Sequence, residues 1–267
     1  MSRSAVRESS TAVVLLTFWK RRVMEFHCAC LDENDSGWSL KQRLRYRVKY
    51  RFYRLVALTE QDREFRERLL GQRVYNIPNP MYKVTSQFST QENRRMFVLA
   101  RLCPQKNIPA LLRAWDRVQT IHPDWTLDIY GEGEDKEEIM RIIREKGLSS
   151  VRLMGYVNNP FEVIPYYSLM LFPSLFEGFG MTLIESMACG VPCVAYDCKC
   201  GPSEIISDGV DGVVVPLNDM DGFIDKVIYL IENIDVRRAM SVRCRESIKR
   251  YDMDIVMRMW VNFFDEI

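Results

Sequence analysis

The sequence predicts an α/β fold in which helices cover both faces of a parallel β-sheet, with a smaller unit in front of it. From about residue 95 onward, short apolar runs typical of strands alternate with longer segments of helical pattern. Parallel strands require crossover connections, and a helix between successive strands supplies them. Glycines and charged residues gather directly after several strand-like runs, where open α/β sheets bind ligands.

The alternating region is predicted to form one ligand-binding domain over residues 92–250. Its predicted strands are Met96–Ala100, Thr126–Tyr130, Val151–Met154, Leu169–Phe172, Pro192–Ala195 and Gly212–Val215. Its predicted helices are Ile108–Thr120, Asp135–Lys146, Glu162–Tyr167, Met181–Cys189 and Ser203–Ser207. Residues 251–267 are expected to form a final helix.

Residues 1–85 lack this regular alternation. Ser9–Glu25 contains one strand-like run, and Cys28–Gly37 has the composition of an irregular loop. Ile77–Pro80 holds two prolines that cannot continue a helix or a central strand, so it is predicted to be a boundary. The polar stretch Thr85–Asn93 predicts a linker or an exposed loop.

The stretch Lys41–Arg54 contains seven cations and no acid, and two structures fit it. Arg43–Phe52 alternates basic and apolar residues, as a strand does. Leu44, Val48 and Phe52, followed by Leu55, also fall at helical spacing, and we favour the helix because Arg, Lys, Leu and Gln tolerate it well. Residues 41–54 then predict either peripheral contact with anionic lipid or a solvated amphipathic helix.

Composition excludes several classes of protein. The 37 Lys and Arg residues against 36 Asp and Glu give a net charge of +1, without the basic field of a nucleic-acid-binding protein. The apolar run Ala12–Trp19 is too short to span a bilayer. Since no secretory leader is recognised, the 8 cysteines are expected to be reduced thiols. The expected location is the cytoplasm, either free or peripheral on the inner face of the membrane.

Two glutamates flank a glycine-rich turn in the sequence Glu177-Gly178-Phe179-Gly180-Met181-Thr182-Leu183-Ile184-Glu185. Gly178 and Gly180 permit a sharp turn into the next helix, whose first N–H groups can bind phosphate oxygens. Carboxylates accept hydrogen bonds from sugar or ribose hydroxyls, which would flank such a phosphate. The alternative is structural, with Glu177 capping the helix and Glu185 solvated on its surface.

Three further groups of polar residues follow predicted strands. Arg101 and Lys106 come after the first, Gly131 and Glu132 after the second, and Tyr156 after the third. Any one of these could be an ordinary turn or a solvated surface charge. Because they fall on one rim of the predicted sheet, together they predict a binding site.

The ordered motifs resemble one known family. Glu177 and Glu185, in the setting Pro173-Ser174 to Val194-Ala195, resemble the E-x7-E signature of family 4 glycosyltransferases, the group 1 glycosyltransferases. Ala100-Arg101-Leu102 with Lys106-Asn107, Tyr130 to Gly133, Gly155-Tyr156-Val157 and Gly201 to Ile206 resemble further family motifs in the same order. The resemblance covers about residues 95–251. It implies a GT-B architecture of two Rossmann-like domains and a retaining reaction.

The resemblance also implies roles for individual residues. Glu177, Arg101 and Lys106 would be catalytic: the carboxylate faces the transferred sugar and the cations stabilise the departing diphosphate. Glu185 would accept hydrogen bonds from the ribose, and a set of loop residues would complete the donor site. These are Gly178, Phe179, Gly180, Met181, Thr182, Gly131, Glu132 and Tyr156.

The N-terminal part departs from the family pattern. A complete member has an acceptor domain about as large as the donor domain, with a glycine-rich loop near its start. Residues 1–85 match only the tail of such a domain, so we expect a truncated N-terminus whose first residues, 1 to about 35, match nothing in the family. By the same resemblance, 251–267 would cross back to this N-terminal part.

No metal or cofactor site is predicted. Cys189, Cys193, Cys198 and Cys200 lack the closer pairs usual in zinc sites, and the Asp219/Asp221 and Asp252/Asp254 pairs lie outside the predicted rim. The nucleotide diphosphate sugar would be a substrate rather than a cofactor.

The predicted function is transfer of a hexose from a nucleotide diphosphate sugar to a glycan or lipid-linked acceptor with retention. Two alternatives stay open: a module that binds nucleotide sugar without transfer, and another GT-B enzyme such as an epimerase or phosphorylase.

Overall fold

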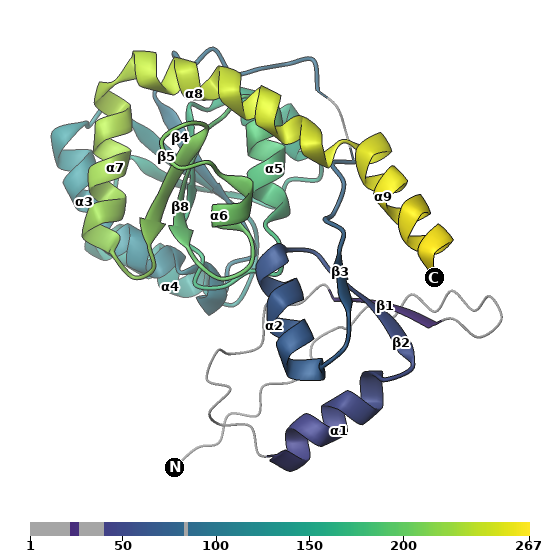
Figure 1. The fold of residues 1–267 in the computed structure, drawn as a ribbon. Coiled ribbons are helices and arrows are strands. Elements are labelled where there is room, and N and C mark those ends of the chain that lie inside the picture. Colours follow the sequence, from purple (N-terminus) through teal and green to yellow (C-terminus); the bar gives the residue numbers. More distant parts are fainter. Residues whose placement is uncertain (1–21, 27–39, 83–84) are drawn as a thin grey trace.

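The computed structural model describes residues 22–26, 40–82 and 85–267. These residues form a large sheet of six parallel strands in the order β6-β5-β4-β7-β8-β9, and a small parallel sheet in the order β1-β2-β3. Figure 1 shows the small sheet beside the large one, with α8 and α9 leading from one to the other. The α/β fold with a helix-covered parallel sheet is thus confirmed.

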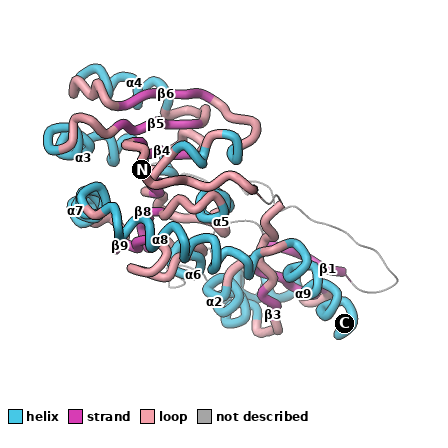
Figure 2. The backbone as a smooth tube through the Cα atoms, turned by 90° about the horizontal axis from the view of Figure 1, so that it is seen from above, coloured by secondary structure: helices cyan, strands magenta, loops and turns pink. Residues whose placement is uncertain are grey.

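The large sheet follows the predicted strands closely. Its strands are β4 (Arg95–Leu99), β5 (Thr126–Tyr130), β6 (Val151–Gly155), β7 (Leu169–Phe172), β8 (Cys193–Asp197) and β9 (Gly212–Pro216). Figure 2, a view from above, shows them stacked across the molecule. Most residues of β7 and β8 are buried, as expected for parallel strands covered on both faces.

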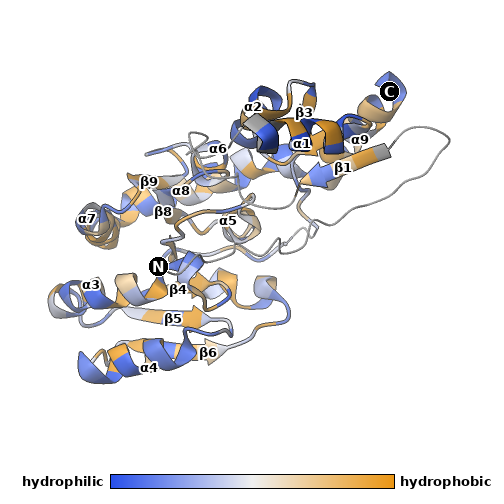
Figure 3. Ribbon diagram, turned by 90° about the horizontal axis from the view of Figure 1, so that it is seen from below, coloured by the Kyte–Doolittle hydropathy of each residue, from blue (hydrophilic) through white to orange (hydrophobic). Residues whose placement is uncertain are grey.

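Helices cover the two faces of the large sheet separately. The first face packs on α3 (Ile108–Ile121), α4 (Lys136–Glu145) and α7 (Met220–Glu232). The second packs on α5 (Met181–Ala188), α6 (Pro202–Ile205), α8 (Ile234–Ser247) and the 3₁₀ turn η5 (Ile248–Tyr251). In Figure 3 the apolar residues lie between these layers and the polar faces of α4 and α7 are outermost.

One connection differs from the predicted helices. Instead of one helix over Glu162–Tyr167, the chain forms two 3₁₀ turns, η3 (Pro160–Glu162) and η4 (Ile164–Tyr166). Each begins with or contains a proline near its first position, which removes the N–H that a continuous α-helix would need. The stretch 85–93 is irregular, as predicted for a linker. Part of this stretch nevertheless packs against the rest of the protein, since Ser89 and Gln91 are buried.

The small unit consists of β1 (Arg22–Phe26), α1 (Leu40–Tyr50), β2 (Tyr53–Ala57), α2 (Glu60–Leu70) and β3 (Val74–Asn76), with the C-terminal helix α9 (Met253–Glu266). Helices α1 and α2 pack on one face of its sheet and α9 on the other. Phe263 of α9 lies with its ring centroid 4.7 Å from that of Tyr75 in β3. The predicted loop Cys28–Gly37 and most of the predicted run Ser9–Glu25 lie outside the described residues.

The helix favoured for residues 41–54 ends earlier than predicted. α1 stops at Tyr50, and Tyr53 begins a strand. The stripe of Leu44, Val48 and Phe52 is 61%, 61% and 74% exposed, whereas Tyr46 and Tyr50 form the packed face. Leu55, placed on the same stripe, is buried in β2 instead. The spacing of the apolar residues therefore predicted a helix correctly, but the side of the helix that these residues mark faces solvent and not the core.

Among the described residues, five cysteines are free and buried: Cys103, Cys189, Cys193, Cys198 and Cys244. Cys200 is disulfide-bonded, which differs from the expectation that every cysteine is reduced. No helix in the described part of the chain has the length and apolar character needed to cross a membrane.

Candidate functional site

The loops after β4, β5 and β6 continue the hydrogen bonding of their strands. Backbone bonds join Ala100 N to Tyr130 O at 3.1 Å, Leu102 N to Glu132 O at 2.9 Å and Gly131 N to Gly155 O at 2.8 Å. Arg101, Glu132 and Tyr156 belong to these neighbouring loops. The structure therefore places three of the predicted site residues on one continuous rim at the carboxyl edge of the sheet.

Glycines allow these loops to approach so closely. A Cβ atom at Gly131 would lie 1.8 Å from the carbonyl oxygen of Ala100, and one at Gly133 would lie 2.1 Å from that of Leu102. Both glycines also have φ angles, +138° and +156°, that other residues rarely adopt. Neither position can carry a side chain without moving the backbone of the neighbouring loop.

The 3₁₀ turn η2 (Pro104–Lys106) connects this rim to the Glu177 loop. Gln105 makes two bonds to that loop: its carbonyl accepts from Leu175 N at 2.9 Å, and its Nε2 donates to Phe176 O at 2.7 Å. Lys106 Nζ donates to Glu177 Oε1 at 2.5 Å. The two groups that the resemblance makes catalytic, a cation and a carboxylate, thus meet directly.

The Lys106–Glu177 pair is largely removed from solvent. The side chains are 17% and 9% exposed, so water screens their attraction only weakly. The Lys106 ammonium also lies 5.6 Å from the centre of the Phe172 ring, a favourable cation–π distance. Arg101, in contrast, is exposed and lies beside Cys103 and Glu134. Among the described residues, no ion pair joins Arg101 to Glu177.

The second glutamate lies within α5. Gly180, at φ +110°, turns the chain into this helix, and Met181 and Thr182 supply its first N–H groups. Glu185 follows about one turn later and is 6% exposed. Burial raises the pKa of Glu185 to about 7, and the hydroxyl of Tyr82 opposes this shift by hydrogen bonding. The structure excludes the alternative in which Glu185 is solvated on the helix surface.

The remaining predicted residues differ in environment. Phe179 is buried with its ring centroid 5.5 Å from that of Tyr251, while Gly178 is half-buried. Glu132 is exposed and pairs with Lys136 at 2.9 Å. Tyr156 is 74% exposed, so its ring is free to contact a ligand at the end of the rim.

Sequence reasoning missed three residues around the site: Gln105, Tyr82 and Tyr251. Gln105 fixes the Glu177 loop, Tyr82 adjoins Glu185, and Tyr251 supports Phe179. Gln105 lies within a motif already singled out, so its position was a usable signal. Tyr82 and Tyr251 come from segments distant in sequence, and no local pattern marks them.

One of the aspartates discounted as metal ligands has a structural role. Asp219 caps α7 by accepting from Gly222 N at 2.9 Å. In the part of the chain that the structure describes, no three His, Cys, Asp or Glu side chains gather in a group suited to a metal ion.

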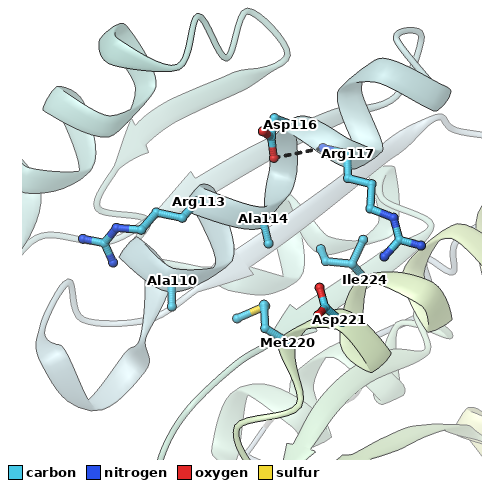
Figure 4. A pocket seen from close by; sticks show the side chains of 8 residues that line it. All are labelled: Ala110, Arg113, Ala114, Asp116, Arg117, Met220, Asp221 and Ile224. Carbon is cyan, nitrogen blue, oxygen red and sulfur yellow. Dashed lines mark hydrogen bonds between the residues drawn. The ribbon is translucent and has the colours of Figure 1, made fainter.

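A shallow pocket of about 470 Å³ lies between α3 and α7, away from the predicted site residues (Figure 4). Ala110, Ala114 and Ile224 contribute apolar atoms, and Arg113 and Arg117 lie at its sides. The two guanidinium groups already pair with Glu138 and Asp225. None of the predicted site residues lines this pocket, so it does not explain the rim motifs.

The part of the chain that contains this rim is similar in sequence to known proteins. A family model described as "Glycosyl transferases group 1" matches residues 85–247. The chain is 32% identical over 218 residues to an exopolysaccharide phosphotransferase of Streptomyces coelicolor, covering 80% of this chain and 23% of that protein. It is 27% identical to a poly(ribitol-phosphate) alpha-N-acetylglucosaminyltransferase of Staphylococcus aureus, covering 79% of this chain and 43% of that protein.

Solved structures have the same architecture. A mutant of S. aureus TarM, solved with Fondaparinux, alpha-GlcNAc-glycerol and UDP, superimposes with a TM-score of 0.81 at 25% identity. The superposition covers 91% of this chain and 50% of that one. The chain therefore spans half, or less, of the length of these three proteins.

Proposed function

We propose, from the premise that the chain belongs to the group 1 glycosyltransferases, that it transfers a hexose from a nucleotide diphosphate sugar to an acceptor. The observation that supports this most directly is the direct contact of Lys106 with Glu177 beside the first turn of α5. A cation, a carboxylate and unpaired helix N–H groups adjoin one another there. This combination suits a diphosphate attached to a sugar.

Each group has a physical role in the proposed transfer. Negative charge grows on the diphosphate as the glycosidic bond breaks, and Lys106, Arg101 and the N–H groups of Met181 and Thr182 would stabilise it. Glu177 would accept hydrogen bonds from hydroxyls of the transferred sugar. Glu185 in α5, together with Gly131, Glu132 and Tyr156 on the rim, would bind the nucleoside. None of these groups requires a metal ion.

The proposed reaction retains anomeric configuration. The resemblance to family 4 glycosyltransferases supports this outcome and a displacement on one face of the sugar. In that displacement the bond from the anomeric carbon to the phosphate oxygen breaks as the acceptor oxygen bonds to the same face. The departing phosphate oxygen takes the acceptor proton. The transition state would be oxocarbenium-like, and the ion pair would hold the phosphate in place.

The proposed acceptor is a glycan or a lipid-linked acceptor. One S. aureus relative carries a name that specifies a polymer of ribitol phosphate, and the solved TarM mutant was bound to alpha-GlcNAc-glycerol and UDP. These describe the relatives, and they support a hydroxylated polymer as the acceptor class and UDP as the first nucleotide to test.

Thermal unfolding with a panel of UDP-, GDP- and ADP-sugars tests the donor. A ligand present at 100 times its dissociation constant stabilises the folded state by about 2.7 kcal/mol, which raises the melting temperature by several degrees. We expect one nucleotide to do so in the wild type and to have little effect on Lys106→Met. No shift with any nucleotide would contradict the proposed function.

A turnover assay separates transfer from binding alone. We expect release of nucleoside diphosphate that depends on a glycan acceptor and is lost in Glu177→Gln. A thermal shift without turnover would instead favour the binding module as the function of this chain.

We also propose that α1 contacts anionic lipid. The exposed residues Leu44 and Val48 of α1, with Phe52 just beyond its end, are flanked by cations, and residues 40–54 contain no acid. In the described part of the chain, none of the exposed cations of α1 has a carboxylate partner. An exposed apolar stripe flanked by cations that have no carboxylate partner among the described residues matches the interface of an anionic bilayer, where each cation contributes about 1 kcal/mol.

Co-sedimentation with vesicles tests the lipid contact. We expect binding to vesicles of phosphatidylglycerol and phosphatidylcholine, no binding to phosphatidylcholine alone, and at least tenfold weaker binding for R45E/R51E/R54E. The matched control, R141E/R144E on α4, should bind as the wild type does. If the triple variant and the double variant sediment with the vesicles to the same extent, α1 is a solvated helix without a lipid contact.

A further inference from the structure

Glu204 joins the two units of the molecule through backbone hydrogen bonds. It lies in α6 of the large unit, and its carboxylate accepts from Glu60 N at 2.7 Å and from Gln61 N at 2.9 Å. Those N–H groups are the first two of α2 in the small unit. Gln61 completes the contact, because its Oε1 accepts from Cys200 N at 3.0 Å. Figure 1 shows the end of α2 beside α6.

These bonds complete the N-terminus of α2. The first N–H groups of a helix have no partner within the helix, and its positive dipole end favours a negative charge. Within α2, Thr59 accepts from Asp62 N at 3.2 Å and so satisfies one of them. The two before it donate to Glu204, which belongs to the other unit. The helix end is therefore fully bonded when the two units are in contact.

The backbone of Glu204 is tied to the donor-binding loop. Arg250 donates to the carbonyl of Ile205 at 2.6 Å and to that of Glu204 at 3.2 Å. Tyr251, next to Arg250, packs edge-on against Phe179 of the glycine-rich loop. A Cβ at Gly201 would lie 1.9 Å from the carbonyl oxygen of Phe179, which shows how closely the two backbones meet.

We propose that Glu204 is a positioning residue that holds α2 of the small unit against the donor-binding loop. It acts through its own backbone contacts, Tyr251 and Phe179, rather than by touching the donor. This inference depends on the proposed glycosyltransferase function, since the loop it positions is the donor loop.

Hydrogen exchange of individual amides tests the contact without any ligand. We expect the amides of Glu60 and Gln61 to exchange at least tenfold faster in Glu204→Ala than in the wild type, with β4 to β9 unchanged. Glu204→Gln keeps the size of the side chain but only one acceptor oxygen, and an intermediate rate is expected. The matched control, Glu246→Ala, removes an exposed glutamate that pairs only with Arg243 on α8.

Kinetics and UDP binding then test the positioning role. In Glu204→Ala we expect kcat/KM to fall about tenfold while the dissociation constant of UDP changes less than threefold. Unchanged exchange of the two amides would overturn the contact. Faster exchange with wild-type kcat/KM would overturn the positioning role. Absence of UDP binding in the wild type would overturn the proposed function itself, and the amide exchange would still report whether the contact exists.

Discussion

Lys106 and Glu177 form the largely buried ion pair of the rim, so each side chain depends on the other. Replacing Lys106 by Met leaves the Glu177 carboxylate buried without its counter-charge, and we expect a loss of about 3 kcal/mol in the free energy of unfolding. Urea unfolding measures this loss. Arg243→Ala, which breaks an exposed pair on α8, should cost less than about 1 kcal/mol.

The double variant K106M/E177Q distinguishes stability from function at this pair. Removing both charges leaves nothing buried and unpaired, so the free energy of unfolding should return to within about 1 kcal/mol of the wild type. Nucleotide binding should stay weak, because the cation is absent. If the double variant regains both the stability and the nucleotide binding of the wild type, Lys106 contributes to binding only by stabilising the fold.

Glu185 should give the protein a specific dependence on pH. Its pKa in the folded state is about 7, above the ordinary value of 4.5, because burial disfavours the charged form. The folded state therefore holds a proton that the unfolded state has lost between these values, and stability contributed by Glu185 falls as pH rises from about 5 to about 8. The loss is at most about 3 kcal/mol.

Urea unfolding of the wild type and of Glu185→Gln at pH 5, 6, 7 and 8 measures this effect. Because Gln does not titrate, the variant should gain stability relative to the wild type as pH rises. A difference that stays constant across the series would show that Glu185 titrates normally.

The sequence predicts which residues lie on the rim but not which of them contact one another. Lys106 and Glu177 could be identified because each follows a strand within a recognisable motif. Their direct contact, however, depends on the η2 turn and on Gln105, which no spacing rule predicts. Arg101 follows the same strand as Lys106, but its side chain is exposed in the structure. The position after a strand determines only the loop to which a residue belongs and not the direction of its side chain.

At the level of elements, the close approach of the β4 and β5 loops makes a sharp prediction. Gly131→Ala would place a methyl group 1.8 Å from the Ala100 carbonyl oxygen at a φ of +138°. We expect a loss of about 3 kcal/mol in stability. Gly147→Ala is the matched control, since its φ is +60° and no atom lies within 4 Å of the new Cβ; there we expect about 1 kcal/mol. Thermal unfolding compares the two, and equal losses would contradict the steric explanation.

Element boundaries were predictable where the apolar pattern reflects burial on both faces. The strands of the large sheet begin and end within two residues of the predicted ranges, and most of their residues are buried. The edge strand β6, in which buried and less buried residues alternate, is the exception. The α1 region was harder, since Leu44 and Val48 imitate a core stripe while the aromatic rings of Tyr46 and Tyr50 make the actual contacts. Nothing local shows which of two apolar stripes faces the sheet.

For the whole molecule, α9 determines how firmly the small sheet is held. Phe263 is 3% exposed and packs on Tyr75 and Trp260. Phe263→Ala should therefore cost about 3 to 5 kcal/mol, and amide exchange should accelerate in β1 to β3 more than in β4 to β9. Phe264→Ala, at a position 41% exposed, is the matched control with little expected effect. Uniform acceleration in both sheets would mean that they unfold as one unit.

Burial of the thiols has a practical consequence for following this molecule in solution. Burial raises the pKa of Cys189, Cys193 and Cys198 to about 12, so almost no thiolate is present at neutral pH. Maleimide reacts with thiolate, and these sulfurs also lie beyond its reach in the folded chain. Alkylation at these positions therefore requires the layer around α5 and β8 to open, so the rate of labelling reports how often the large unit opens locally.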